Sequence, residues 1–258
     1  MKISKIFDSA TESEQFNLRT VAEIVLIIFV FVFFLKAVVL DFFLVSSSSM
    51  ETTLLKKDIL FVSRLSYFIG FGDKLPYLNI PVSDDFRFNF NSPKRDDIIF
   101  FKNSFYSLRN YDEHYLIKRV LLIPGDIIYY SPINGQLHFS KNKPDSFSDE
   151  YFPAVIPEKG NFIKLNFNNI KFYKHIIENE GNSVTISPNE ILINNEPANR
   201  YIFNQSHYFV EGDNKNNSFD SRVYGLIPGN VILGKALFIF WSGAIEKTNL
   251  FDRFIKWL

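Results

Sequence analysis

The sequence predicts a mainly β protein, built as an antiparallel sheet or a barrel, with one apolar helix near the N-terminus. Eight segments rich in β-branched and aromatic residues carry the strand prediction: 97–101, 116–123, 126–130, 161–167, 183–186, 190–193, 207–210 and 231–241. Turn-forming pairs such as Pro124-Gly125 and Asn194-Asn195 lie between them. The run from Ile24 to Leu35 contains no turn signal and is apolar throughout, which sets it apart from the strands.

This apolar run predicts a membrane anchor. Apolar character extends from Ala22 to Val45, interrupted in its second half by Lys36 and Asp41, and about 20 residues suffice to cross a bilayer. We place the anchor at 22–42, after an N-terminal tail at 1–21. A cleaved signal peptide is the alternative, because the unbroken apolar core has the length of one. The mostly polar tail, with its acidic residues, favours an uncleaved anchor.

Two further segments depart from the strand pattern. Between residues 168 and 181, Ile170, Tyr173, Ile176 and Ile177 recur at helical spacing and predict a short helix, which Asn168 or Asn169 could cap and Gly181 could end. Residues 65–94 are rich in Pro, Gly, Asn and Asp, which predicts a long surface excursion.

Composition excludes several kinds of site. Lys and Arg together number 28, as do Asp and Glu, so the formal net charge is zero, and a nucleic-acid partner is disfavoured. The chain has no cysteine, so it has neither a thiolate nucleophile nor a cysteine-based zinc site. Its four histidines lack ligand spacing. We therefore predict no metal and no cofactor, although a Ser-His-Asp triad stays open, because its members need not be close in sequence.

Serine and lysine remain as candidate chemistry. Four serines follow the apolar run in VSSSSMETTL (45–54), either as a polar linker or as the site of a nucleophile. Lys118 lies in HYLIKRVLLI, an apolar strand context. Burial lowers the pKa of a lysine and would let it act as a base. Strand alternation would turn Lys118 toward a core and Arg119 outward. The alternative is an edge strand with both side chains solvated, and composition alone favours that alternative.

Four blocks occur in an order that resembles bacterial type I signal peptidases, which are membrane-anchored serine proteases with a Ser/Lys dyad. The blocks are SSSMETTLLKKDILFVSRLSY (47–67), RDDIIFFK (95–102), YLIKRVLLIPGDII (115–128) and EGDNKNNSFDSRVYGLIPGNVILGKA (211–236). The resemblance implies a catalytic domain at 43–258, with core blocks at 43–130 and 207–258 and an inserted β subdomain at about 131–206.

The resemblance also implies roles for individual residues. Ser49, directly before Met50, matches the nucleophile, and Lys118 matches the general base. Ser218 matches a serine that orients this lysine. Ser47 and the Ser49 N–H match the oxyanion donors. Asp220 and Arg222 match a structural pair near the site.

The implied substrates are exported preproteins, cut after small side chains that shallow apolar pockets read. Candidate pocket residues are Phe43, Val45, Met50, Leu54 and Ile117. The resemblance further implies a plasma-membrane protein that contacts the lipid bilayer, with its N-terminus in the cytoplasm and its catalytic domain on the extracytoplasmic side.

Several residues depart from the family pattern. Thr52 and Ser46 stand where proline is usual, Asp96 stands where glycine is common, and Phe100 replaces a smaller residue and could narrow a pocket. These changes keep open a catalytically silent, membrane-anchored paralogue that binds exported chains. A Ser/Lys hydrolase that cleaves itself is a third alternative, which the anchor and the 211–236 block disfavour.

Overall fold

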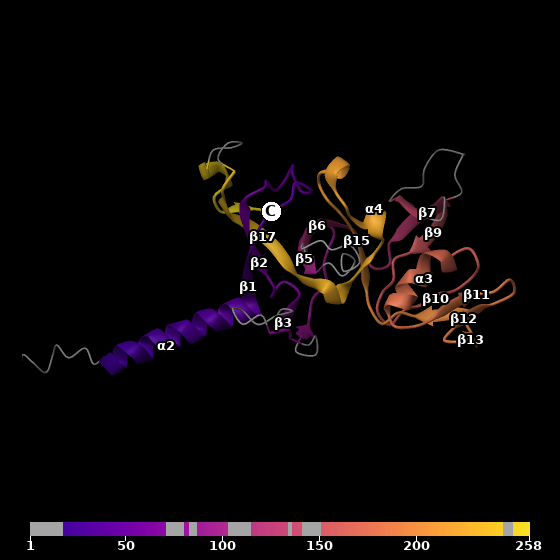
Figure 1. The fold of residues 1–258 in the computed structure, drawn as a ribbon, viewed down its shortest axis with the longest axis horizontal. Coiled ribbons are helices and arrows are strands. Elements are labelled where there is room, and N and C mark those ends of the chain that lie inside the picture. The colour runs from indigo at the N-terminus through magenta and orange to yellow at the C-terminus, as the bar shows by residue number, and fades with distance from the viewer. Residues whose placement is uncertain are drawn as a thin grey trace, which may run out of the picture.

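An eight-stranded antiparallel sheet organises the fold, as the sequence predicts. Its strand order is β1 (Leu40–Leu44), β2 (Asp58–Ser63), β17 (Ile232–Ser242), β5 (Ile98–Lys102), β6 (Tyr115–Leu122), β15 (His207–Glu211) and β16 (Ile227–Pro228), with β18 (Lys256–Trp257) paired to β17. This computed structural model describes residues 18–70, 80–82, 87–102, 115–133, 136–140, 151–244 and 250–258. Figure 1 shows the sheet in the middle of the molecule and a second group of strands to its right.

Sequence-predicted strands form the middle of this sheet. The predicted segments 97–101, 116–123, 207–210 and 231–241 correspond to β5, β6, β15 and β17 within a residue or two. The two strands at one side, β1 and β2, were not predicted. They pair in register from Leu40 opposite Ser63 to Leu44 opposite Ile59.

The expected anchor begins as a helix but ends as a strand. Helix α2 (Leu18–Phe34) continues into a π-helical turn, η1 (Leu35–Val39), and the chain then enters β1. The anchor predicted at 22–42 is therefore helical only as far as residue 39, because residues 40–42 belong to the sheet. Figure 1 shows α2 projecting away from the body of the molecule. Within the described part of the chain, no helix has both the length and the apolarity needed to cross a membrane.

Arg64 fixes the junction between this helix and the sheet. Its side chain donates to the Asp41 carboxylate and to the Lys36 carbonyl, both at 2.9 Å. The Arg64 N–H donates to the carbonyl of Val39 at 3.0 Å. These contacts hold the last turn of the helix against the start of the sheet.

Small sheets and one helix make up the second group of strands. Its elements are β7 (Ile127–Ile133), β8 (Gln136–Ser140), β9 (Phe152–Val155), β10 (Phe162–Lys164), α3 (Ile170–Asn179), β11 (Val184–Ile186), β12 (Ile191–Ile193), β13 (Glu196–Pro197) and β14 (Arg200–Ile202). The strands pair as β8-β7-β9, β10-β14 and β11-β12-β13. Because β7 pairs with β8 and β9, this group begins a few residues before position 131.

The predicted short helix is confirmed as α3. Asn169 occupies its N-cap position, but the Asn169 side chain makes no capping hydrogen bond. Gly181 follows the helix with a φ of 88°, a conformation that favours glycine. Its apolar face buries Ile170, Phe172, Tyr173, Ile176 and Ile177 in the core of this subdomain.

The expected surface excursion at 65–94 is only partly on the surface. Its described residues include the paired strands β3 (Phe68–Gly70) and β4 (Arg87–Asn89). Tyr67 and Phe68 are buried in a core cluster with residues from β5, β6 and β15. Residues 71–79 and 83–86 lie outside the described residues.

Candidate active site

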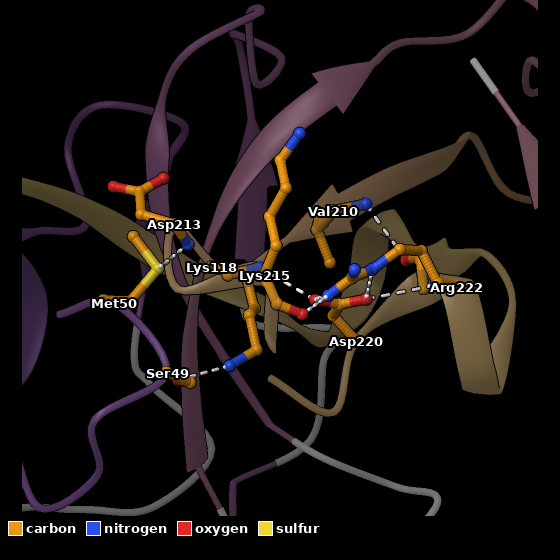
Figure 2. Close-up of polar contacts among 10 residues, drawn as sticks. Ser49, Met50, Lys118, Val210, Asp213, Lys215, Asp220 and Arg222 are labelled. Atoms are coloured by element: carbon orange, nitrogen blue, oxygen red, sulfur yellow. Dashed lines mark hydrogen bonds and ion pairs between the residues drawn. The ribbon is translucent and has the colours of Figure 1, made fainter. Parts of the chain in front are cut away.

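Ser49 lies in the turn that joins β1 to β2. The N–H groups of Thr53 and Leu54 donate to the Met50 carbonyl at 3.0 and 2.8 Å, which closes the turn directly after Ser49. The residue is buried, with 8% of its surface exposed. Its hydroxyl oxygen accepts a hydrogen bond of 2.6 Å from the Lys118 side-chain nitrogen. Figure 2 shows the two side chains pointing toward each other. The serine run is therefore a folded turn, and not a solvated linker.

Lys118 reaches Ser49 from the middle of the sheet. Its strand, β6, pairs with β5 on one side and β15 on the other. Its exposed fraction is 2%, which places it among the most buried large side chains of the described residues. The edge-strand alternative is thus wrong. Burial disfavours the charged form of a lysine. A lysine can accept a proton only in its neutral form.

Ser47 places a second hydroxyl beside the nucleophile candidate. Its Oγ lies 3.3 Å from the Ser49 Oγ. Among the described residues, no hydrogen bond uses the N–H of Ser49. The Ser47 hydroxyl therefore lies beside the Ser49 hydroxyl, and the predicted role of Ser47 and the Ser49 N–H as oxyanion donors stays a prediction.

The loop after β15 holds the serine turn in place. The Asn214 N–H donates to the Ser49 carbonyl at 2.9 Å. The Asn214 and Asn217 side-chain amides donate to the Ser48 carbonyl at 3.1 Å and to the Ser48 hydroxyl at 2.7 Å. The sequence reasoning assigned no role to these two asparagines, although both lie in the fourth block of the resemblance.

Asp220 and Arg222, the predicted structural pair, form an ion pair next to this loop. The carboxylate of Asp220 is fully buried and accepts from the Gly212 N–H at 3.0 Å and from the Arg222 guanidinium at 2.8 and 2.9 Å. Arg222 also donates to the Lys215 carbonyl at 2.9 Å. Burial would raise the pKa of Asp220, but the hydrogen bonds from Arg222 and Gly212 outweigh it and hold that pKa below its ordinary value. Arg222 belongs to α4 (Ser221–Tyr224) and Asp220 is its N-cap, and Figure 2 shows the pair beside Lys215, the first residue of η4 (Lys215–Asn217).

Ser218 lies beside this pair. Its hydroxyl oxygen is buried, and no hydrogen bond of good geometry to it is found within the described ranges. Its approach to the Asp220 carboxylate still lowers the pKa of that carboxyl, as a weak hydrogen bond does. No direct bond from Ser218 to Lys118 is found among those residues, so its predicted role in orienting the lysine stays a prediction.

A second ion pair, which the sequence reasoning missed, lies on the other side of Lys118. Arg119 donates to both oxygens of Asp213 at 2.8 Å, and the Thr53 hydroxyl donates to the same carboxylate. The expectation that Arg119 faces solvent is wrong, since this bidentate pair holds it half-buried. Burial would raise the pKa of Asp213, but the bonds from Arg119 and Thr53 hold it below its ordinary value. The pair ties the strand of Lys118 to the turn of Ser49.

The candidate pocket residues surround one small cleft. It encloses about 300 Å³, part of it open to solvent, and Ser49 and Ser47 lie at its wall. All five predicted pocket residues contribute to its lining: Phe43, Val45, Met50, Leu54 and Ile117. Phe100 does not line the cleft. Its ring packs behind Phe43 and Tyr115, with ring centroids 4.9 and 5.2 Å apart.

One departure from the family pattern has a conformational explanation. Asp96, which stands where glycine is common, has a φ of 67°. This left-handed conformation suits glycine, and aspartate tolerates it better than most residues do. The turn that precedes β5 is therefore kept without the glycine.

No group of three or more His, Asp or Glu side chains suited to a metal ion occurs in the described part of the chain.

Comparison with known proteins places the chain in a family. A family model described as signal peptidase, peptidase S26, matches residues 18–151 and 201–241. Three similar proteins, each named signal peptidase I, come from Helicobacter pylori (strain J99), Buchnera aphidicola of Acyrthosiphon pisum and Pseudomonas aeruginosa. The first is 27% identical over 88% of this chain and 82% of its own. The second is 29% identical over 83% and 72%, and the third 28% over 86% and 72%. The family match covers well over half of the residues, so the chain belongs to the signal peptidase family, peptidase S26.

Proposed function

We propose that this protein removes N-terminal signal peptides from exported preproteins, with Ser49 as nucleophile and Lys118 as general base. The observation that carries the proposal is the 2.6 Å hydrogen bond between the Lys118 side-chain nitrogen and the Ser49 hydroxyl, both buried beside an apolar cleft. The proteins named signal peptidase I that resemble this chain support the choice of substrate.

The mechanism begins with neutral Lys118. Its amine takes the proton from the Ser49 hydroxyl while that oxygen attacks the scissile carbonyl. Negative charge develops on the carbonyl oxygen, where the Ser49 N–H and the Ser47 hydroxyl can donate hydrogen bonds to it. Each such donor contributes about 3 kcal/mol of transition-state stabilisation.

The tetrahedral intermediate then collapses. Lys118 returns its proton to the leaving amine, which departs as the new N-terminus of the mature protein. The signal peptide remains as an ester on Ser49. Water, deprotonated by Lys118, hydrolyses this ester and restores the free serine. The extended signal peptide would lay its small side chains in the cleft lined by Phe43, Val45 and Ile117.

Cleavage of a preprotein by purified variants tests the dyad. We expect Ser49→Ala and Lys118→Ala each to abolish cutting at the signal-peptide junction, read by mass spectrometry of the products. Lys235→Ala is the matched control, because Lys235 also lies in a central strand but pairs with Asp97 instead. If either dyad variant cuts normally, the mechanism is wrong. If the wild type cuts nothing while it is folded, the silent paralogue is favoured.

We further propose that α2 and η1, which continue into one another from Leu18 to Val39, together anchor the protein in the plasma membrane, with the catalytic domain on the extracytoplasmic side. From Val21 to Phe34, α2 exposes large apolar side chains, among them Ile27 at 67% and Phe29 at 61%. Such a surface is unfavourable in water and suits lipid. Protease treatment of sealed inverted vesicles should leave residues 43–258 intact. Digestion of this domain would contradict the orientation.

A further inference from the structure

The C-terminal segment reaches the serine turn through a buried arginine. Arg253 lies in η6 (Leu250–Arg253), close to the end of the chain, and 6% of it is exposed. Its guanidinium donates to both carboxylate oxygens of Asp58 and, at 3.0 Å, to the carbonyl of Thr53. Thr53 belongs to the turn that begins at Ser49.

Asp58 extends this contact to both ends of the segment that carries Ser49. Its fully buried carboxylate also accepts from the Leu55 N–H at 2.7 Å and from the Ser242 hydroxyl. Its backbone carbonyl accepts from the Val45 N–H at 2.8 Å. The residues immediately before and after the serine turn are therefore tied to one buried ion pair.

Thr53 is held from two opposite directions. Arg253 binds its carbonyl, and Asp213 accepts from its hydroxyl. The Thr53 N–H donates to the Met50 carbonyl at 3.0 Å, one residue beyond Ser49. Because Asp213 also binds Arg119, next to Lys118, a change in the position of Thr53 would move the serine relative to the lysine.

The C-terminal segment itself is fixed to the sheet. Strand β18 pairs with β17, with Trp257 opposite Phe238, and the Leu258 N–H donates to the Leu237 carbonyl at 3.0 Å. Arg253 is thus presented from a docked element.

We propose that Arg253 is a positioning residue for Ser49, which makes the C-terminal segment part of the peptidase machinery. This inference rests on the proposed dyad. A displacement of about 1 Å at a reacting group can lower a rate about 100-fold. Arginine suits the position because its planar fork serves a carboxylate and a carbonyl at the same time, whereas lysine offers a single charged point.

Three variants and one matched control test this inference. Arg253→Met removes the contacts, Arg253→Lys keeps only the charge, and Arg253→Met with Asp58→Asn avoids leaving a buried unpaired carboxylate. Arg64→Met is the control. Arg64 and Arg253 each have a side chain 8% exposed, and each binds one carboxylate and one backbone carbonyl.

We expect kcat to fall at least about ten-fold in Arg253→Met and in the double variant, with a smaller change in KM, and to fall less in Arg253→Lys. Arg64→Met should keep kcat within about two-fold of wild type wherever both variants are folded. Equal losses of kcat in Arg253→Met and Arg64→Met would overturn the inference, because loss of stability alone would explain them.

Hydrogen–deuterium exchange gives a readout that does not depend on activity. Exchange of the amides at 51–55 should rise in Arg253→Met and the double variant and stay at the wild-type level in Arg64→Met. Unchanged exchange at 51–55 in the Arg253 variants would overturn the inference. A rise there in a protein that cuts no preprotein would support the positioning role and count against the proposed function alone.

Discussion

At the scale of single residues, Gly212 shows how closely the site is packed. A Cβ at this position would lie 2.2 Å from the Ser218 hydroxyl oxygen and 2.4 Å from the Ser49 carbonyl oxygen. The Gly212 N–H donates to buried Asp220, so its backbone cannot move away without losing that bond. The glycine is needed because two parts of the site meet across it.

Gly212→Ala should therefore displace the serine turn. We expect the free energy of unfolding to fall by about 1–3 kcal/mol, as is typical of overpacking, and kcat to fall at least about ten-fold. Chemical denaturation and the cleavage assay measure the two effects. Gly229→Ala is the control, because its Cβ would lie no closer than 3.3 Å to another atom. Wild-type activity in Gly212→Ala would show that the turn tolerates displacement.

At the scale of elements, the sequence predicts best where a strand carries a run of β-branched, aliphatic and aromatic residues. Strands β5 and β17 lie inside the sheet and have long runs of apolar residues, which made them visible. Strand β1 was absorbed into the expected anchor, because LDFFL continues the apolar run without a turn signal. Strands β13 (EP) and β14 (RYI) were missed because they lack the uninterrupted β-branched and aliphatic character of the equally short β11 (VTI) and β12 (ILI), which were predicted at 183–186 and 190–193. Pairing with β2, β12 and β10 in the structure, and not the local pattern, identifies β1, β13 and β14 as strands.

Three strands meet in an aromatic stack beside the cleft. Phe43 in β1, Phe100 in β5 and Tyr115 in β6 pack in that order, and only the outer two line the cleft. Phe100 is 6% exposed and fixes both neighbours. The prediction that Phe100 narrows a pocket therefore becomes an indirect one: Phe100 holds the two rings that line the cleft in their positions.

Phe100→Leu should widen the cleft and relax selection. We expect the ratio of kcat/KM for preproteins with Ala over Leu three residues before the cut to fall several-fold, because one larger side chain in an apolar pocket is typically discriminated by about 10-fold or more. Competition between the two preproteins measures the ratio. Phe101→Leu is the control, since Phe101 is buried in a different core cluster. An unchanged ratio in Phe100→Leu would remove Phe100 from the determinants of specificity.

At the scale of the whole molecule, the site depends on contacts between distant segments. The dyad could be predicted because the ordered blocks resemble a family, whereas composition alone favoured a solvated Lys118. Thr53 and Asp213 are 160 residues apart, and Asp58 and Arg253 are 195 apart. A single sequence gives no sign of such pairings until the sheet brings them together. The supporting ion pairs around Ser49 therefore had to come from the structure.

His207 joins the large sheet to the inserted subdomain and should make stability depend on pH. It begins β15 and is 3% exposed; its Nδ1 lies 3.1 Å from the Gln205 carbonyl, and its ring packs edge-on against Phe203. Burial lowers the pKa of His207 to about 4, although the nearby Glu180 carboxylate and the Gln205 carbonyl favour the charged form. The folded protein therefore keeps this histidine neutral at a pH where the unfolded chain would protonate it.

The sign of the effect follows from proton binding. Between pH about 6.5 and pH about 4 the unfolded chain binds one proton more at His207 than the folded protein does, so the free energy of unfolding falls as the pH falls. The full effect is about 3 kcal/mol. Asp213 and Asp220, whose pKa values are held below the ordinary 3.8, stabilise the fold above that pH and lose this contribution only in more acidic solution.

Urea denaturation at several pH values between 4 and 8 measures how the free energy of unfolding changes with pH. This free energy should change less steeply with pH in His207→Gln than in wild type. In His138→Gln it should change as steeply as in wild type, because the His138 side chain is exposed on β8. Equal slopes in His207→Gln and wild type would mean that His207 takes up its proton without unfolding.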